Sequence, residues 1–444
     1  MPSTVRQELS ALTRLATPLL LTGLGYMLLG VVDTAIVGRL GEVPLGAVGL
    51  GNGLYFTVSV LGWGWMLALD PLIAQAVGAG EPEEARRVLW QGIWVGVFGA
   101  LPLTLLVVAL TFVIGFFGVP EATVADTGPY LIARAVGIFP FLLVTALRSF
   151  LQGHEVTRPL LLSVAVANVI NVPLSYGLVF GWSPIGLEGM GAEGAGWAST
   201  IATVVQFVTL AVAVRGLWGD FPGARRPELA MIGKVLRLGS PIGLQLVAEV
   251  GSFAIVGVLM GNIGTRSLAA HQIALLLISV TFQLALALGA ATATRVGHAI
   301  GRGSTDGARL SGMTGIGAGG VAMLFWSVLF LSLPEPLARL FTDEAGVIEA
   351  TIPLLAIAAA FQISDGVQAV AAGALRGAGD TRWPLVSNVI GHYAIGVPCG
   401  VLLAFVASWR AAGLWVGLSA GLTVVAVALT VRFWVLMQRE VRRA

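Results

Sequence analysis

Twelve apolar stretches, each long enough to cross a lipid bilayer as a helix, dominate this chain. A bilayer core about 30 Å thick requires roughly 20 apolar residues in helical conformation. Closed β-barrels also span lipid, but they show short alternating segments, whereas these runs are continuous. The runs begin near Leu15, Leu45, Leu89, Tyr130, Leu160, Gly194, Val235, Leu268, Gly312, Ala350, Leu385 and Gly413. The sequence therefore predicts an all-α integral membrane protein with twelve transmembrane helices.

The low charge content supports this prediction. Only 11% of the 444 residues are charged, whereas a soluble protein carries about 25%. This excludes an ordinary water-soluble domain, a disordered chain and a nucleic-acid-binding protein. The chain has no P-loop for ATP, its one cysteine excludes an internal disulfide, and its four histidines lack the spacing of a zinc site. We therefore expect no cofactor.

The basic residues predict an orientation in the membrane. If both termini are cytoplasmic, 20 of the 25 Lys and Arg residues lie on the cytoplasmic side, and Arg134 lies within a span. Only four then lie outside: Arg39, Arg266, Arg339 and Arg410. This asymmetry obeys the positive-inside rule. The first apolar run lacks a convincing cleavage site, so we expect a multi-pass protein of the cell (inner) membrane that retains this span.

The second half of the chain repeats the first. Pro18 and Pro241 are one of many pairs separated by 223 residues, and the offset drifts to 225 further along. Each half holds six spans, so both halves enter the membrane from the same side, related by a pseudo-two-fold axis along the membrane normal. We expect two six-helix lobes joined by a cytoplasmic linker: an N-terminal lobe at 1–217, the linker at 218–234 and a C-terminal lobe at 235–444.

Three carboxylates lie well inside predicted spans: Asp33 in the first, Glu249 in the seventh and Asp365 in the tenth. Each costs roughly 2.5–3.5 kcal/mol on insertion scales, and a carboxyl in this setting can exchange a proton for a cationic ligand. The alternative interpretation is a structural hydrogen bond or ion pair with a neighbouring helix. The repeat does not pair the three residues with one another, so each half carries its own polar chemistry.

Other polar residues accompany these carboxylates in the spans. Asn168 and Asn171 are three residues apart, on one face of the fifth span, although packing between helices remains an alternative role for this pair. The remaining supporting residues are Ser175 in the fifth span, His271 and Gln272 at the start of the eighth, and Gln362 beside Asp365.

Five motifs together resemble those of the multidrug and toxic compound extrusion (MATE) family, and the second half looks NorM-like. They are VVDTAIVG at 31–38, AAHQI at 269–273, RVGH at 295–298, QISDGVQ at 362–368 and LRGAGDTR at 375–382. The resemblance implies a secondary exporter, not an enzyme, that exchanges small-molecule drugs or toxic organic cations for H⁺ or Na⁺. It also implies that the protein acts in the lipid bilayer, and we expect a monomer.

The resemblance assigns roles to individual residues. Asp33 matches the acidic residue of the N-lobe cation site, and Glu249 and Asp365 match the acidic pair of the C-lobe. Two external acidic residues, Asp343 and Glu344, match positions that contact cationic drugs.

The chain departs from its family pattern at two positions. Phe361 stands where NorM-like members often have a Tyr, which removes a hydroxyl ligand from the expected Na⁺ site. Ser175 stands where some relatives carry Asp or Asn, so a single carboxylate remains in the N-lobe. Both departures leave the coupling ion open.

Three other functions fit the sequence less well than export. A lipid-linked precursor flippase of the same superfamily would call for a central cavity rich in Arg, whereas the central charges here are acidic. An intramembrane prenyl or glycosyl transferase usually shows paired Asp motifs for Mg²⁺, and the only adjacent acids here lie in loops. A structural scaffold would not need three buried carboxylates.

Overall fold

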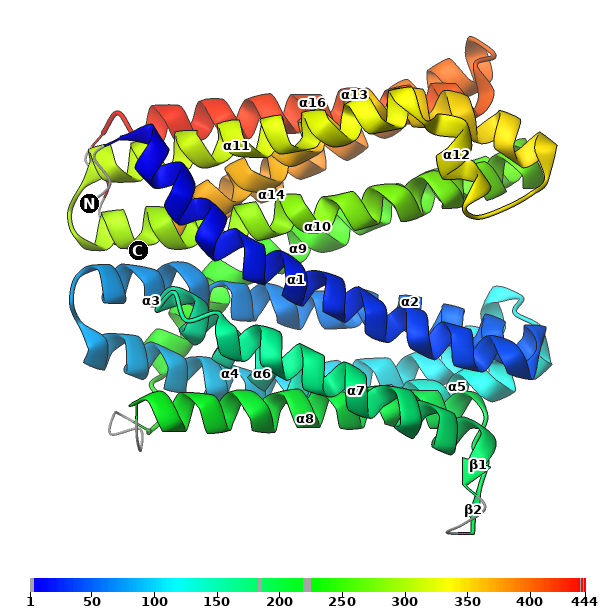
Figure 1. The fold of residues 1–444 in the computed structure, drawn as a ribbon, viewed down its shortest axis with the longest axis horizontal. Coiled ribbons are helices and arrows are strands. Elements are labelled where there is room, and N and C mark those ends of the chain that lie inside the picture. Colours follow the sequence, from blue (N-terminus) through cyan, green and yellow to red (C-terminus); the bar gives the residue numbers. More distant parts are fainter. Residues whose placement is uncertain (1–3, 183–185, 219–224, 440, 442) are drawn as a thin grey trace. The chain divides into compact units, whose positions relative to one another are not determined.

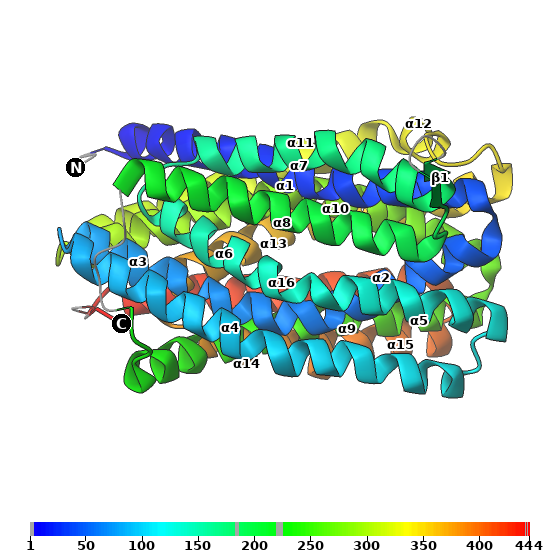
Figure 2. The same cartoon turned by 90° about the horizontal axis from the view of Figure 1, so that it is seen from below.

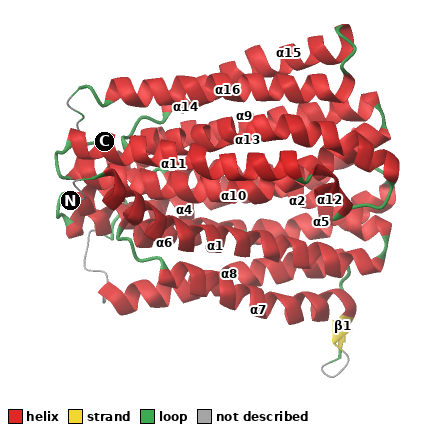
Figure 3. Ribbon diagram, turned by 45° about the horizontal axis from the view of Figure 1, so that its top comes forward, coloured by secondary structure: helices red, strands yellow, loops and turns green. Residues whose placement is uncertain are grey.

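The computed structural model describes residues 4–182, 186–218, 225–439, 441 and 443–444, and this part of the chain is almost entirely helical (Figures 1 and 3). The α-helices are α1 (Val5–Val37), α2 (Glu42–Leu67), α3 (Leu69–Gly78), α4 (Pro82–Val113), α5 (Glu121–Val136), α6 (Ile138–Gly153), α7 (Arg158–Phe180), α8 (Ala192–Trp218), α9 (Leu229–Ile263), α10 (Thr265–Gly301), α11 (Thr305–Ser332), α12 (Pro334–Arg339), α13 (Ala345–Gly377), α14 (Arg382–Val389), α15 (Val397–Val401) and α16 (Arg410–Leu436). The other elements are the 3₁₀-helices η1 (Gly38–Leu40) and η2 (Ile114–Phe117), the π-helices η4 (Ile390–Gly396) and η5 (Leu402–Val406), and the strands β1 (Gly181–Trp182) and β2 (Leu187–Glu188).

The helices account for the predicted spans. Eleven helical segments in the described residues are long and apolar enough to cross a membrane. A twelfth span is present when α5 and α6, which meet at a bend of 41°, are taken together. The bend lies at Gly137, three residues before Pro140, which cannot donate the backbone hydrogen bond that would continue the helix. The all-α membrane fold is confirmed.

Contacts divide the chain into two compact units. Unit 1 comprises Met1–Leu20, Ala74–Gly80 and Leu244–Ala444, and unit 2 comprises Leu21–Ile73 and Glu81–Gly243. Helices α1, α3 and α9 therefore contribute residues to both units. The lobe boundaries expected from the repeat, 217/218 at the end of α8 and 234/235 within α9, remain a prediction.

Close helix packing in unit 1 depends on small residues. α13 packs against α10, α11 and α16 (Figure 1). A Cβ atom added to Gly289 of α10 would lie 2.8 Å from the carbonyl oxygen of Ala369 on α13, so any larger residue would push the two backbones apart. The aromatic rings of Phe361 and Trp415 fill the apolar core that these helices enclose.

Unit 2 is packed in the same way. α7 runs beside α8, and α5 contacts both α2 and α8 (Figure 2). A Cβ atom added to Gly196 of α8 would lie 3.0 Å from the Tyr130 carbonyl oxygen of α5. After α7 the chain forms a short antiparallel pairing of β1 and β2, with Gly181 opposite Glu188. These contacts bring α1, α5, α7 and α8 together around the carboxylate described below.

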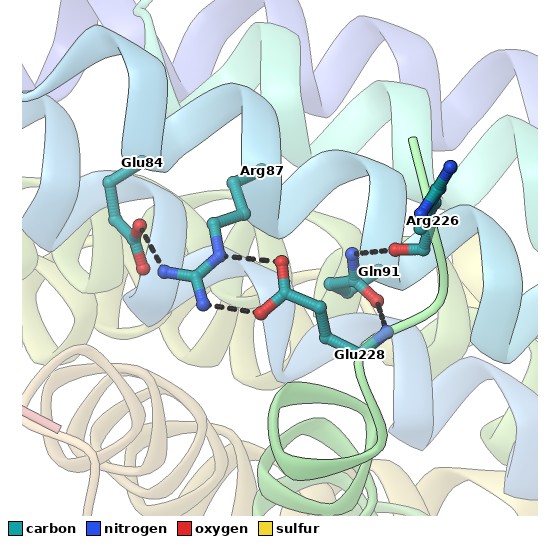
Figure 4. A network of polar contacts seen from close by, with 5 residues as sticks. All are labelled: Glu84, Arg87, Gln91, Arg226 and Glu228. Carbon is teal, nitrogen blue, oxygen red and sulfur yellow. Dashed lines mark hydrogen bonds and ion pairs between the residues drawn. The ribbon is translucent and has the colours of Figure 1, made fainter. Parts of the chain in front are cut away.

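The end of the linker is bound to α4 within unit 2 (Figure 4). Arg87 donates to both carboxylate oxygens of Glu228, with 2.8 Å from its Nε to Oε1. The Gln91 amide donates to the Arg226 carbonyl over 3.0 Å and accepts from the Glu228 N–H over 2.8 Å. Of the predicted linker 218–234, residues 219–224 lie outside the described residues, and α9 already begins at Leu229.

This attachment predicts that the protection of the linker from proteases depends on pH and on the Glu228 carboxylate. Hydrogen bonds from Arg87 lower the pKa of Glu228 below its ordinary value, because they favour the carboxylate. The contribution of Glu228 is therefore complete above the ordinary Glu pKa and is lost as pH falls through the lowered one. At neutral pH, Glu228→Gln removes the charge, and we expect trypsin to cleave after Arg225 several-fold faster than in the wild type, whereas Pro227 protects the bond after Arg226.

The control is Glu83→Gln, which removes a carboxylate whose side chain is 71% exposed and pairs with Arg86. Exposed pairs of this kind contribute little, so cleavage of the linker should stay at the wild-type rate. Equal cleavage rates for wild type and Glu228→Gln would show that the carboxylate does not hold the linker.

Candidate functional site

Asp33 lies at the centre of a polar site within unit 2. Its side chain is buried, and the Asn171 amide of α7 donates to Oδ1 over 2.9 Å. The hydroxyl of Ser199 on α8 donates to Oδ2. Ser175, one turn after Asn171, is also buried and interacts with Asp33. Helical spacing thus places two side chains of α7 on the face that meets α1.

A cation is held near this carboxylate. Arg134 on α5 interacts electrostatically with Asp33, and its guanidinium lies 4.1 Å from the centre of the Tyr55 ring on α2. Tyr130, one turn before Arg134, is buried beside it. Asp33 is therefore not an isolated charge: neutral side chains donate to it, and Arg134 interacts with it electrostatically.

Asn168 plays a different part from Asn171. Its amide donates to the carbonyl oxygens of Gly25 on α1 and Val164 on α7, over 3.0 and 2.9 Å. Asn168 therefore links the backbones of two helices and does not contact Asp33. The packing role that the sequence left open fits this residue, whereas Asn171 is the direct neighbour of the carboxylate.

Unit 1 contains the other two carboxylates. Asp365 on α13 is buried and interacts electrostatically with Glu249 on α9. The Gln368 amide, almost one turn after Asp365, donates to Glu249 Oε2 over 3.4 Å. The two acids that the sequence analysis grouped are thus near each other in space. Two carboxyls that repel one another in an apolar setting favour uptake of one positive ion between them.

The remaining predicted residues of unit 1 separate into buried and exposed groups. Gln362 is buried and its amide donates to the Thr281 hydroxyl on α10. His271 is buried against Trp415, with ring centroids 5.7 Å apart, and the Phe361 ring centroid lies 6.0 Å from that of Trp415. Gln272, by contrast, is exposed, so it lies outside this interior.

The two acids expected to contact drugs lie in the connection between α12 and α13. Asp343 and Glu344 are both exposed, and the Glu344 N–H donates to the Thr342 hydroxyl over 3.1 Å. Nothing in their immediate contacts distinguishes them from other exposed loop acids. In the residues that the structure describes, no group of three or more His, Cys, Asp or Glu side chains is placed to hold a metal ion.

Sequence reasoning missed several members of these sites. Ser199 is one of many hydroxyls in apolar spans, and nothing in its neighbourhood in the sequence marks it. Gln368 was not missed: with Gln362 it flanks Asp365 in the QISDGVQ motif, and the structure adds its hydrogen bond to Glu249. Tyr55 becomes part of the N-terminal site only because α2 packs against α5.

Known proteins are similar to this chain in sequence and in fold. The family model MatE matches residues 18–177 and again residues 241–402, which confirms the internal repeat. A probable multidrug resistance protein NorM of Bradyrhizobium diazoefficiens is 36% identical over 96% of this chain and 93% of its own length. A multidrug resistance protein NorM of Vibrio vulnificus is 32% identical over 98% of this chain and 97% of its own length.

Solved structures agree at the level of the fold. The MATE transporter VcmN of Vibrio cholerae, in its bent form, has a TM-score of 0.88 at 20% identity, covering 98% of each chain. The eukaryotic MATE transporter AtDTX14 has a TM-score of 0.86 at 24% identity, covering 96% of each chain. These relatives are transporters and not enzymes. Because the family model matches both halves and the NorM relatives align over nearly the whole length, this chain belongs to the MatE family and is a multidrug transporter of the NorM type.

Proposed function

We propose that the protein exports organic, often cationic and lipophilic, compounds in exchange for H⁺ or Na⁺ by alternating access. The observation that carries this proposal is the buried Asp33, whose two oxygens accept hydrogen bonds from the neutral donors Asn171 and Ser199. A carboxylate whose direct partners are uncharged can bind a cation and release it again. Glu249 and Asp365 provide a second acidic centre of the same kind.

The proposed cycle follows from competition for these carboxyls. Facing outside, Asp33 or the Glu249–Asp365 pair takes up H⁺ or Na⁺ and loses affinity for the drug. Facing inside, the ion leaves and a cationic drug replaces it. Exchange of one monovalent drug for one ion is electroneutral, and each extra ion adds about 2.3 kcal/mol per 100 mV of membrane potential.

We also propose an oligomeric state, a membrane location and a role for the external acids. The protein is proposed to act as a monomer in the cell inner membrane with both termini in the cytoplasm, which agrees with the excess of basic residues assigned to that side. Asp343 and Glu344 are proposed to attract cationic drugs at the external surface, since both are exposed.

Transport by the purified protein in liposomes tests the proposal. Ethidium movement is measured with a pH gradient in Na⁺-free buffer and, separately, with a Na⁺ gradient at equal pH on both sides. We expect at least one gradient to drive ethidium against its own concentration gradient. Failure of both gradients, with protein that is folded and inserted, would contradict ion-coupled export.

A further inference from the structure

Part of the span that begins at Arg382 is a π-helix. η4 covers seven residues, Ile390–Gly396, and π-helical turns are rare and often found at functional sites. Two glycines press this segment against α16: a Cβ atom on Gly391 would lie 2.8 Å from the Gly421 carbonyl oxygen, and one on Gly396 would lie 3.2 Å from that of Gly417. The backbone of η4 therefore packs directly against the backbone of α16.

The π-helix carries a buried imidazole with unused hydrogen-bonding groups. His392 has no exposed surface, and neither of its ring nitrogens has a hydrogen-bond partner in the described part of the chain. Asn388, four residues earlier, is equally buried, and both polar atoms of its amide also lack partners there. Burial of unpartnered polar groups costs free energy, so two such residues in one segment point to a ligand that uses them.

The same segment contacts α9 on both sides of Glu249. The Tyr393 hydroxyl donates to the Ala248 carbonyl over 2.8 Å, and Gly251 leaves room for it, because a Cβ atom there would lie 2.6 Å from that hydroxyl. On the other side, the rings of His392 and Phe253 have centroids 6.3 Å apart. The contacts of His392 and Tyr393 therefore lie on either side of Glu249 along α9.

Few other charged groups face this segment. The elements that pack against it, directly or through Phe253, carry these titratable or charged residues: Lys234, Arg237 and Glu249 on α9, Glu349, Asp365 and Arg376 on α13, Arg382 on α14, Cys399 on α15, and Arg410 and Arg432 on α16. Arg410 and Arg432 lie near the ends of α16, and Arg432 is paired with Asp380. Of these residues, Glu249 alone lies on the stretch of α9 that Tyr393 and Phe253 bracket.

We propose that His392 is a proton-binding residue of unit 1 and that the coupling ion there is H⁺. The imidazole takes up one proton from external water, Asn388 accepts a hydrogen bond from the protonated ring, and Glu249 supplies the opposing negative charge. The proton leaves to water on the cytoplasmic side. One H⁺ entering against one monovalent organic cation leaving balances the charge. This inference rests on the proposed export function and names its ion.

The chemistry of the site favours H⁺ over Na⁺. A neutral imidazole offers one donor and one acceptor nitrogen, and a proton converts the ring into a double donor. Alkali and other hard cations prefer carboxylate, carbonyl and water oxygens, whereas imidazole suits transition metals. The ring of Phe361, which lies 6.1 Å from that of Phe253, adds no oxygen ligand to this interior.

Transport in liposomes separates His392 from the other histidines. We expect a pH gradient in Na⁺-free buffer to drive ethidium through the wild type, and His392→Gln to reduce this rate at least about fivefold. Ethidium affinity at equilibrium should change less than about twofold, because glutamine keeps a donor and an acceptor. The matched control is His154→Gln, since the Nδ1 of His154 already contacts the Phe150 carbonyl at 2.9 Å.

The outcomes are distinct. Ethidium transport driven by a Na⁺ gradient alone, or wild-type rates in His392→Gln under a pH gradient, would overturn the assignment while leaving export intact. No wild-type transport under either gradient would instead contradict export itself.

A second measurement follows the protonation of His392 in the wild-type protein. NMR of ring-labelled histidines in the wild type follows the four imidazoles, and His154→Gln, His271→Gln and His298→Gln each remove one signal, so that the signal of His392 is identified. We expect ethidium binding to shift its protonation midpoint. A midpoint that does not respond to ethidium would overturn the proposal.

Discussion

Asp33→Asn and Asp365→Asn should each abolish ion-driven ethidium export while leaving the protein folded in the membrane. Asparagine keeps the shape of the side chain, and at position 33 its oxygen can still accept from Asn171, 2.9 Å from the carboxylate oxygen in the wild type. The Ser199 hydroxyl can rotate to accept from the new amide. What is lost is the negative charge, and with it the ability to bind H⁺ or Na⁺ in competition with a cationic drug. We expect export to fall by on the order of tenfold or more.

The measurement is ethidium efflux from energised cells, with membrane protein levels and size-exclusion profiles showing that each variant folds. Asp306→Asn is the matched control, because Asp306 is an exposed carboxylate in the first turn of α11. It should export at the wild-type rate. Wild-type efflux from both Asp33→Asn and Asp365→Asn would sink the idea that these carboxyls couple the ion to the drug.

The same two residues show how far a sequence can lead to a site. Asp33 and Asp365 are visible because a charge within about 20 apolar residues is costly. Their partners are harder to identify from the sequence. Ser199 reaches Asp33 because α8 packs against α7, and α7 in turn is hydrogen-bonded to α1. Hydroxyls are common in membrane helices, where they bond to their own backbone. Their tertiary role depends on which helix face meets which neighbour.

The Asn pair shows the limit of helical periodicity. Residues three apart lie on one face of a helix but differ by about 60° in direction. That difference is enough to send Asn171 to the Asp33 carboxylate and Asn168 to the Gly25 carbonyl. The sequence could indicate that both lie near α1, but it could not distinguish a ligand of the carboxylate from a link between helices.

The π-helix was not predictable from hydropathy. The run that contains Ile390–Gly396 has the apolar composition of an ordinary span. Pro398 cannot donate a hydrogen bond to the carbonyl four residues before it, and glycines bring the backbone against α16. A proline in a membrane helix predicts a kink or a local change of pitch without specifying which, so the segment carrying His392 required the structure.

Removing Glu8 should destabilise unit 1 more than removing any exposed acid. Arg295 donates from Nε to Glu8 Oε1 over 3.0 Å and from a terminal nitrogen to Oε2 over 2.9 Å. Only 1% of the Glu8 side chain and 12% of the Arg295 side chain are exposed. Glu8→Gln removes the carboxylate charge from this buried ion pair, and breaking a buried pair typically costs about 3–5 kcal/mol. We expect a clear fall in the apparent melting temperature in detergent, followed by intrinsic tryptophan fluorescence at a fixed scan rate.

We expect the large contribution of this pair to stability to come from its burial, and an exposed ion pair elsewhere in the chain tests this. Arg339 and Glu335 also form a close ion pair, at 2.8 Å, but their side chains are 56% and 52% exposed. Glu335→Gln should therefore cost less than about 1 kcal/mol. The double variant Glu8→Leu with Arg295→Met should recover much of the loss, because it removes both buried charges together. If Glu8→Gln melts where Glu335→Gln does, the buried pair does not hold the start of α1 to α10.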